Sequence, residues 1–272
     1  MINAPAVSVI IAAHQARDFI NEAIGSALAQ DVPLEILIAP DEPYDYADLV
    51  RRDPRVRVLG PVPAPTGPGP ARNRALAVAR GDFIALLDAD DLWSPDYLSH
   101  LLPLAETHGT AFGRTSITDW QGHEIRSVAG RDGRADFSTF ETAFASFHGL
   151  ARRDPMRRWQ DVLAEDVLFD LESLALAGGR TPFAAAAVYQ LRQRPHSVTR
   201  GAQFTSGIDA GYKRLVALVE DGSTAIGATF RAAAVRVFRS WAEMNWRFVA
   251  AQATDSSLTY QKFVTEILSS SS

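Results

Sequence analysis

Three carboxylates follow an apolar run within four positions of the sequence. The stretch 85–93 reads ALLDADDLW, and its acids are Asp88, Asp90 and Asp91. Carboxylates this close repel one another, and buried charge is costly unless it is paired or bound to a metal. Hard cations such as Mg²⁺ and Mn²⁺ prefer oxygen ligands and usually leave positions for phosphate groups. The cluster is therefore a candidate site for a divalent cation or a sugar hydroxyl; the alternative is an acidic helix turn on the surface.

A second acidic pair and a basic loop carry the other residue types that such a site needs. Glu165 and Asp166 open a predicted helix over Ala164–Ala177, where the helix dipole favours ionised carboxylates. Asp166 is a candidate general base, although on its own an ordinary acidic first turn is the simpler explanation. The loop RQRPHSVTRG (192–201) could neutralise phosphate or complete a metal sphere, and the alternative is a solvated basic loop. Its candidate contacts are Arg194, His196 and Ser197.

Strands and helices alternate over the first hundred residues, and they must position these side chains. Short β-branched runs predict buried strands, and apolar residues on one face predict helices. The predicted strands are Val7–Ala13, Leu34–Ala39, Arg55–Leu59 and Phe83–Leu87; the predicted helices are 18–30 with Asp18 as N-cap, Pro70–Arg80, and one starting at Ser94. This order is typical of a mostly parallel sheet with helices on its faces, where ligands bind beyond the carboxyl ends of the strands. Asp41 and Asp88 both follow such ends.

The rest of the chain has weaker signals. Residues 107–159 predict only short strands and loops, and Phe183–Leu191 reads as a strand after the helix Ala164–Ala177. Gly207–Ala251 predicts two amphipathic helices, and the Ser-rich end, Ser269–Ser272, predicts a frayed terminus. The aromatic stripe of these helices predicts core packing or a partner face; its members are Trp241, Trp246 and Phe248.

The composition limits the classes of function. A net charge of −5 and a pI near 5.7 give no global support for nucleic-acid binding. The sequence has no cysteine, which excludes disulfides, thiolate metal ligands and a Cys nucleophile. No Lys or Arg precedes Arg17 and no run of about 18 apolar residues occurs, so we expect neither a signal peptide nor a membrane span. The sequence predicts a soluble, cytoplasmic protein.

Five segments, in order, resemble family 2 inverting glycosyltransferases of the GT-A type. The segments are VSVIIAAHQARDFINEAIGSALAQ, LEILIAPDEPYD, TGPGPARNRALAVARGDFIALLDADDLWSPDYL, AEDVLFDLESLALAGG and YQLRQRPHSVTRG. The resemblance implies an α/β fold with a GT-A (Rossmann-like), mostly parallel sheet flanked by helices and a helical C-terminal extension. It divides the chain into a nucleotide-sugar-binding half (1–105), an acceptor-binding and catalytic half (106–203) and the extension (204–272).

The resemblance also implies a role for each matching residue. Asp88 would contact the ribose or uracil, and Asp90 would hold the Mn²⁺ or Mg²⁺ that bridges the two phosphates. Asp91 would help the turn into the next helix, and Asp166 would be the general base beside Glu165. The remaining nucleotide contacts would be Ala12, Asp41 and Arg72. A second metal ligand would be His196, and diphosphate or acceptor contacts would be Arg194, Ser197, Glu165 and Trp159, the last within an arginine-rich segment that also reads as a surface loop.

The implied function is transfer of a sugar from a nucleotide donor, UDP-linked, to a saccharide or lipid-linked saccharide in bacterial surface-glycan assembly. Contact with the inner face of the membrane and a homo-oligomer both stay open. Two segments depart from the family pattern, AAHQ at 12–15 and PDEP at 40–43, and they bear on recognition of the base. The alternatives are a catalytically degenerate nucleotide-sugar-binding protein and a haloacid-dehalogenase-type phosphohydrolase. The latter fits less well because Leu92 stands where that family has Thr or Val.

Overall fold

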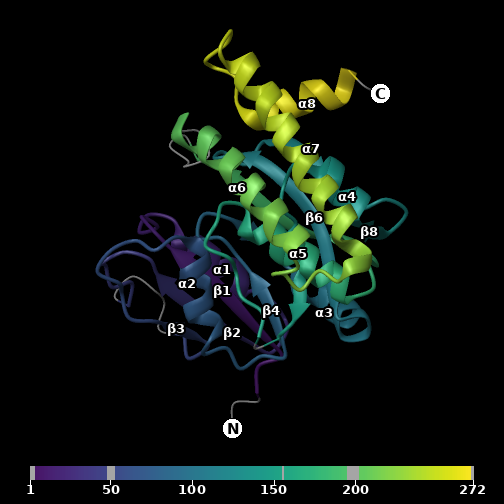
Figure 1. The fold of residues 1–272 in the computed structure, drawn as a ribbon. Coiled ribbons are helices and arrows are strands. Elements are labelled where there is room, and N and C mark those ends of the chain that lie inside the picture. The colour runs from purple at the N-terminus through teal and green to yellow at the C-terminus, as the bar shows by residue number, and fades with distance from the viewer. Residues whose placement is uncertain (1–3, 48–52, 155, 195–201, 271–272) are drawn as a thin grey trace.

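One mixed sheet runs through the protein (Figure 1). The computed structural model describes residues 4–47, 53–154, 156–194 and 202–270. Across the sheet the strands are β3 (Val56–Val58), β2 (Leu34–Pro40), β1 (Val7–Ala13), β4 (Phe83–Leu86), β9 (Leu150–Arg152), β6 (Thr110–Asp119), β10 (Arg180–Gln193) and β5 (Leu92–Trp93). Two more strands pair at the side, β7 (Glu124–Val128) with β6 and β8 (Arg134–Asp136) with β10.

The predicted parallel arrangement is confirmed where the sequence signal is strong. β3, β2, β1 and β4 are parallel neighbours, and β6 and β10 are also parallel. β9 is antiparallel to both of its neighbours, β4 and β6, and joins the two parallel groups. It lies in the segment for which the sequence predicted only short strands and loops.

Helices cover the sheet and extend beyond it. They are α1 (Ile20–Leu28), α2 (Pro68–Leu76), α3 (Tyr97–His108), α4 (Phe137–Ala143), α5 (Glu165–Leu176), α6 (Ala202–Asp221), α7 (Ala228–Gln252) and α8 (Tyr260–Ser270). In Figure 1, α6 and α7 lie side by side near α5, away from the half that carries α1 and α2. The α/β class with a helical C-terminal extension is therefore confirmed. No helix among the described residues is long and apolar enough to cross a membrane.

Several helix ends differ from the prediction. The helix predicted over Pro70–Arg80 is α2, Pro68–Leu76. Phe19, not Asp18, is the N-cap of α1, and Asp96, not Ser94, is the N-cap of α3. The hydroxyl of Ser94 instead accepts a hydrogen bond from Val188 N, which ties this residue to β10. α8, which the sequence did not predict, packs Phe263 into the core and extends to Ser270; the rest of the predicted frayed end, residues 271–272, lies outside the described residues. These differences arise from tertiary contacts that a local pattern does not contain.

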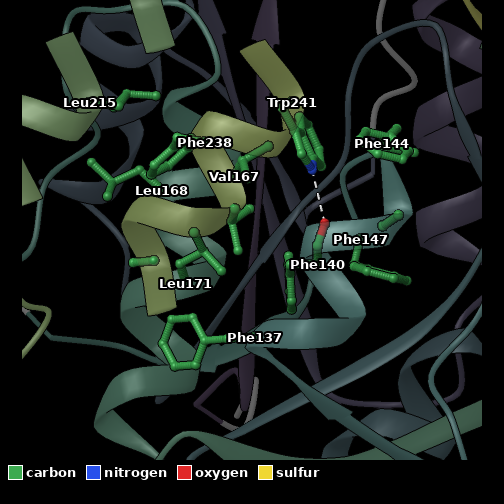
Figure 2. Packing of buried hydrophobic residues seen from close by; sticks show 14 of the residues in the cluster. Phe137, Phe140, Phe144, Phe147, Val167, Leu168, Leu171, Leu215, Phe238 and Trp241 are labelled. Carbon is green, nitrogen blue, oxygen red and sulfur yellow. Dashed lines mark hydrogen bonds between the residues drawn. The ribbon is translucent and has the colours of Figure 1, made fainter. Parts of the chain in front are cut away.

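An aromatic core joins α4 to the C-terminal helices (Figure 2). Trp241 on α7 donates a hydrogen bond from its indole Nε1 to the carbonyl oxygen of Phe140 at 2.9 Å. The ring of Trp241 also lies 6.2 Å from that of Phe144, centroid to centroid. Trp241 and Phe248 are core residues, as predicted, whereas Trp246 is exposed. The extension is thus packed onto the segment that follows the central strands.

Candidate active site

A cavity of about 650 Å³ opens at the carboxyl ends of the parallel strands. Asp41 directly follows β2, and Asp88 follows β4 by two positions. The start of α5 closes another side, and residues of α6, α7 and α8 reach the same cavity. Eight of the predicted site residues line it: Ala12, Asp41, Arg72, Asp88, Asp90, Glu165, Asp166 and Arg194. His196 and Ser197 lie outside the described residues.

Arg72 joins the two acidic segments that the sequence places far apart. Its buried guanidinium contacts Oδ1 of Asp88 at 2.6 Å through Nη2 and pairs with Glu165 through Nη1. Burial would lower the pKa of Arg72, but the charges of Asp88, Glu165 and Asp166 raise it above its ordinary value. Arg72 therefore stays charged and fixes the distance between the strand end and α5.

The carboxylate of Asp90 is partly exposed to solvent and forms an ion pair with Arg194. Its side chain is 22% exposed, and its Oδ2 lies 2.7 Å from Nε of Arg194. Burial and the charge of Asp88 raise the pKa of Asp90, while Arg194 opposes the shift. The repulsion between Asp88 and Asp90 that their spacing predicts is thus present, and the guanidinium of Arg194 offsets part of it.

Asp91 does not serve the turn into α3, so this prediction was wrong. The carboxylate is buried and accepts hydrogen bonds from the hydroxyl of Tyr189 and the amide of Arg192, both at 2.8 Å. The Tyr189 hydroxyl in turn accepts a hydrogen bond from Asp88 N at 3.0 Å. Burial and the charges of Asp90 and Asp88 raise the pKa of Asp91 well above its ordinary value. Asp91 anchors the end of β10 beneath the acidic cluster.

The carboxylate of Asp41 is bound by its own chain. Oδ1 accepts hydrogen bonds from both the amide and the hydroxyl of Thr66 at 2.7 Å, and Oδ2 accepts one from Gly67 N at 2.8 Å. Gly67 has a φ of 95°, a conformation that favours glycine. Asp41 thus shapes the start of α2, and its contact with a nucleotide base stays a prediction.

The two segments that depart from the family pattern bond to each other. Gln15 N donates to Oε1 of Glu42 at 2.7 Å, and Nδ1 of His14 lies 3.1 Å from the carbonyl oxygen of Asp41. The same Oε1 of Glu42 accepts a hydrogen bond from the Tyr46 hydroxyl at 2.5 Å. The AAHQ and PDEP segments therefore form one rigid corner of the cavity.

His148 is a site residue to which the sequence analysis assigned no role. It is 3% exposed; its Nε2 lies 3.2 Å from Oδ2 of Asp166 and 3.7 Å from Oδ2 of Asp88. Burial would lower the pKa of His148, but Asp166, Asp88 and Asp170 raise it to about 9. The only signal in the sequence is a titratable residue inside the apolar run AFASFHGL. Nothing in its spacing connects it with α5.

Asp166 stands at the first turn of α5 and faces the cavity with a side chain that is 20% exposed. Burial would raise its pKa, but the contact with His148 and the charge of Arg72 hold it well below the usual range. The pKa of its neighbour Glu165 is shifted in the opposite direction. Burial raises it to about 7, although the charge of Arg72 acts to lower it. Adjacent carboxylates with pKa values pushed apart are typical of acid–base sites.

Trp159 does not reach the cavity, which corrects its assignment as an acceptor contact. Its side chain is 2% exposed and its ring stacks on Phe169 at 4.2 Å. The backbone N and O of Trp159 are bound by the side chain of Asn73 at 2.9 and 2.7 Å. The guanidinium of Arg157 stacks on the same Phe169 ring, so this end of the arginine-rich segment is core and not an open basic surface. Burial of a large aromatic ring in the core is more favourable than its exposure to solvent.

Part of the cavity has a mostly aromatic lining from the C-terminal helices. Side chains from α6, α7 and the start of α8 contribute, namely Ile208, Tyr212, Trp241 and Tyr260. The buried hydroxyl of Tyr260 has no hydrogen-bond partner among the described residues. An unsatisfied buried hydroxyl is costly, so a ligand with hydroxyl groups fits this region.

The residues present fit a cation that arrives with phosphate. Among the described residues, no three of His, Cys, Asp and Glu stand close enough to hold an ion by themselves. Asp90 offers a partly exposed carboxylate in the same cavity as Asp88. Mg²⁺ commonly takes one or two carboxylates and fills its other positions with water and substrate phosphates.

The sequence profile of glycosyl transferase family 2 matches residues 8–158. A succinoglycan biosynthesis protein, ExoO of Rhizobium meliloti (strain 1021), is 28% identical over 220 residues, which are 72% of this chain and 63% of that protein. The chain therefore spans less than two thirds of this relative.

Solved structures share the fold. TarS 1–349 of S. aureus in complex with UDP-GlcNAc superposes with a TM-score of 0.59 at 16% identity, over 84% of this chain and 70% of that chain. The mannosyltransferase PcManGT of Pyrobaculum calidifontis, in complex with GDP-Man and Mn²⁺, gives 0.54 at 17% identity, over 98% and 79%. The phosphohydrolase interpretation of the Asp-x-Asp pair is therefore wrong, because the sheet, the order of the segments and the matching profile agree on another family. The chain belongs to glycosyl transferase family 2 and has the GT-A fold.

Proposed function

We propose that this protein is an inverting glycosyltransferase that moves a sugar from a nucleotide donor, UDP-linked, to a hydroxyl of a saccharide or lipid-linked saccharide in bacterial surface-glycan assembly. One observation carries the proposal: Asp88 and Asp90 share a single cavity with Asp166, whose carboxylate is held ionised. The name of the related ExoO protein supports the pathway class, and the UDP-GlcNAc complex of TarS supports a UDP donor.

The donor side is the edge formed by β1, β2 and β4. Asp88 is 32% exposed and accepts from Arg72 at Oδ1, and its Oδ2, which lies 3.7 Å from Nε2 of His148, can accept a hydrogen bond from a ribose hydroxyl. Ala12 and Asp41 line the same side. The rigid corner made by the AAHQ and PDEP segments would then define the shape of the base pocket.

The diphosphate side is next to Asp90 and Arg194. When bound at Asp90, with His196 as a second ligand, Mg²⁺ or Mn²⁺ supplies charge stabilisation for the leaving diphosphate. Arg194 can move from Asp90 to a phosphate oxygen, a partner for which a guanidinium is well suited. Ser197 would donate a further hydrogen bond to phosphate.

Asp166 would accept the proton of the acceptor hydroxyl. The acceptor oxygen then forms a bond to the anomeric carbon while the bond from that carbon to the diphosphate breaks, and its electron pair leaves with the diphosphate. Because the acceptor attacks from the face opposite the leaving group, the configuration inverts. Glu165, bound to Arg72, would keep the first turn of α5 in place beside this base.

The aromatic part of the cavity would bind the acceptor. Its residues line the same cavity as Asp90 and Asp166, and the unsatisfied hydroxyl of Tyr260 can bond to a sugar hydroxyl. Aromatic side chains such as Trp241 and Tyr212 present apolar faces to a sugar ring or a lipid chain.

A panel of nucleotide sugars tests the proposal. Binding and UDP or GDP release are measured for UDP-glucose, UDP-galactose, UDP-N-acetylglucosamine and GDP-mannose, with and without Mn²⁺. We expect Mn²⁺-dependent binding of UDP-sugars that Asp90→Ala abolishes and the exposed control Asp161→Asn keeps. Binding without turnover over a broad acceptor panel would indicate the degenerate binding protein, and no nucleotide binding at all would reject the proposal.

A further inference from the structure

The surroundings of Asp166 depend on one buried imidazole. Among the described residues, two cations act on this carboxylate: His148 at 3.2 Å, and Arg72 through its charge. Arg72 is already bound to Asp88 and Glu165. His148 is therefore the positive group in closest contact with Asp166. The second carboxylate near the His148 ring is that of Asp88, on the donor side.

The backbone of His148 is held from several elements, and one aromatic ring packs against its imidazole. Asp170 on α5 accepts hydrogen bonds from the backbone amides of His148 and Gly149 at 3.0 and 3.1 Å. The hydroxyl of Tyr97 donates to the carbonyl oxygen of His148 at 3.1 Å, and the ring of Tyr189 lies 4.5 Å away. His148 has a φ of 48°, an uncommon conformation for a residue other than glycine, which persists only where the surroundings enforce it.

The charge around this ring is mostly negative. The charged groups that face His148 or act on it are Asp88, Asp91, Asp166 and Asp170. Glu165 adds a further carboxylate next to Asp166, and within the described part of the chain Arg72 is the other cation that acts on this base. Without the imidazolium, Arg72 alone would face these acids, and burial would favour a proton on at least one of them.

We propose that His148 is a positioning residue that keeps Asp166 ionised and aimed into the cavity, and that it ties this base to Asp88 on the donor side. Its consequence for transfer rests on the proposed function, whereas the ion pair itself does not. When a nucleotide binds, its ribose would draw the Asp88 carboxylate away from His148. The imidazole would then pair with Asp166 alone, so binding of the donor would strengthen the contact between His148 and the base.

Histidine NMR tests the ion pair without any activity. The chain has six histidines, and His148→Asn assigns the ring signal of His148. We expect a titration midpoint near 9 in the parent protein, and a fall by more than about one pH unit in Asp166→Asn, because a carboxylate partner is lost. UDP with Mg²⁺ should shift the same signal. A midpoint at or below the ordinary value of about 6.5, or one that Asp166→Asn leaves unchanged, would overturn the proposal.

The pH profile of transfer separates a positioning role from a structural one. In His148→Asn and His148→Gln we expect UDP affinity within about threefold of the parent protein and transfer reduced about 100-fold near pH 6, with at least tenfold recovery near pH 9, where Asp166 is again ionised. The exposed His100→Asn is the matched control. An equal loss at every pH in both variants, or no loss, would contradict the role. If the protein transfers no sugar, the proposed function fails while the NMR result still decides the ion pair.

Discussion

Nε of Arg194 lies 2.7 Å from Oδ2 of Asp90, so the carboxylate that we assign to a cation is paired with a charge of the protein itself. The guanidinium also lies over the ring of Phe19 at 4.5 Å. A cation can bind Oδ2 of Asp90 only when Arg194 leaves that oxygen, and a diphosphate would offer the guanidinium another partner.

The first prediction follows from this competition. Arg194→Gln should bind Mn²⁺ alone more tightly than the parent protein, by up to about fivefold, because a partly exposed ion pair contributes at most about 1 kcal/mol. Isothermal titration without nucleotide measures the effect, and Arg114→Gln is the surface control. The same variant should bind UDP with Mn²⁺ more weakly. Weaker binding of Mn²⁺ alone would show that Arg194 does not compete for Asp90.

The second prediction concerns the hydroxyl of Tyr189. Tyr189→Phe removes two buried hydrogen bonds, to Asp88 N and Asp91, and should lower the free energy of unfolding by about 1–3 kcal/mol. It should also weaken nucleotide binding, because Asp88 loses its backbone anchor. Urea unfolding and UDP titration check both effects, with the half-buried Tyr44→Phe as control. Unchanged stability would exclude an anchoring role for Tyr189.

The third prediction concerns stability against pH. The pKa of His148 rises from 6.5 to about 9 on folding, so its contribution to stability is complete below about pH 6.5 and is lost as the pH rises through 9. The contribution is about 3 kcal/mol at most. The difference in free energy of unfolding between the parent protein and His148→Asn should therefore shrink over this interval. Chemical unfolding at a series of pH values measures it, and a constant difference would contradict a charged His148.

The fourth prediction separates stability from acceptor binding. Tyr260→Phe removes a buried hydroxyl without a hydrogen-bond partner among the described residues, so stability should be unchanged or higher. The KM for a saccharide acceptor should rise several-fold, with the KM for the donor unchanged. Steady-state kinetics on both substrates distinguishes these effects, and an equal rise in both KM values would place Tyr260 outside the acceptor region.

Local patterns predicted the first four strands to within one residue at each end and put Asp41 and Asp88 just after two of them, because short β-branched runs are encoded within a few residues. They did not predict the partners of those acids. The role of Asp91 depends on Tyr189 and Arg192, about a hundred residues away, and the pairing of AAHQ with PDEP depends on the parallel register that sets Ala13 beside Pro40.

His148 was missed for a related reason. The position of His148 depends on the hydrogen bond from its amide to Asp170 and on its left-handed backbone conformation. Neither feature can be recognised from the residues next to it in the sequence. Trp159 was misassigned because an aromatic residue beside arginines reads as a surface ligand contact until its packing on Phe169 is known. The division of the chain at residues 105 and 203 stays a prediction.

Transfer by Asp166→Asn tests whether Asp166 is the general base. We expect the variant to bind the nucleotide sugar with the affinity of the parent protein while the transfer rate falls by about 10²–10⁴-fold, the usual contribution of a general base. Asp161→Asn, an exposed acid just before α5, should transfer at the parent rate. Transfer by Asp166→Asn at the parent rate, with the nucleotide sugar bound, would contradict the account.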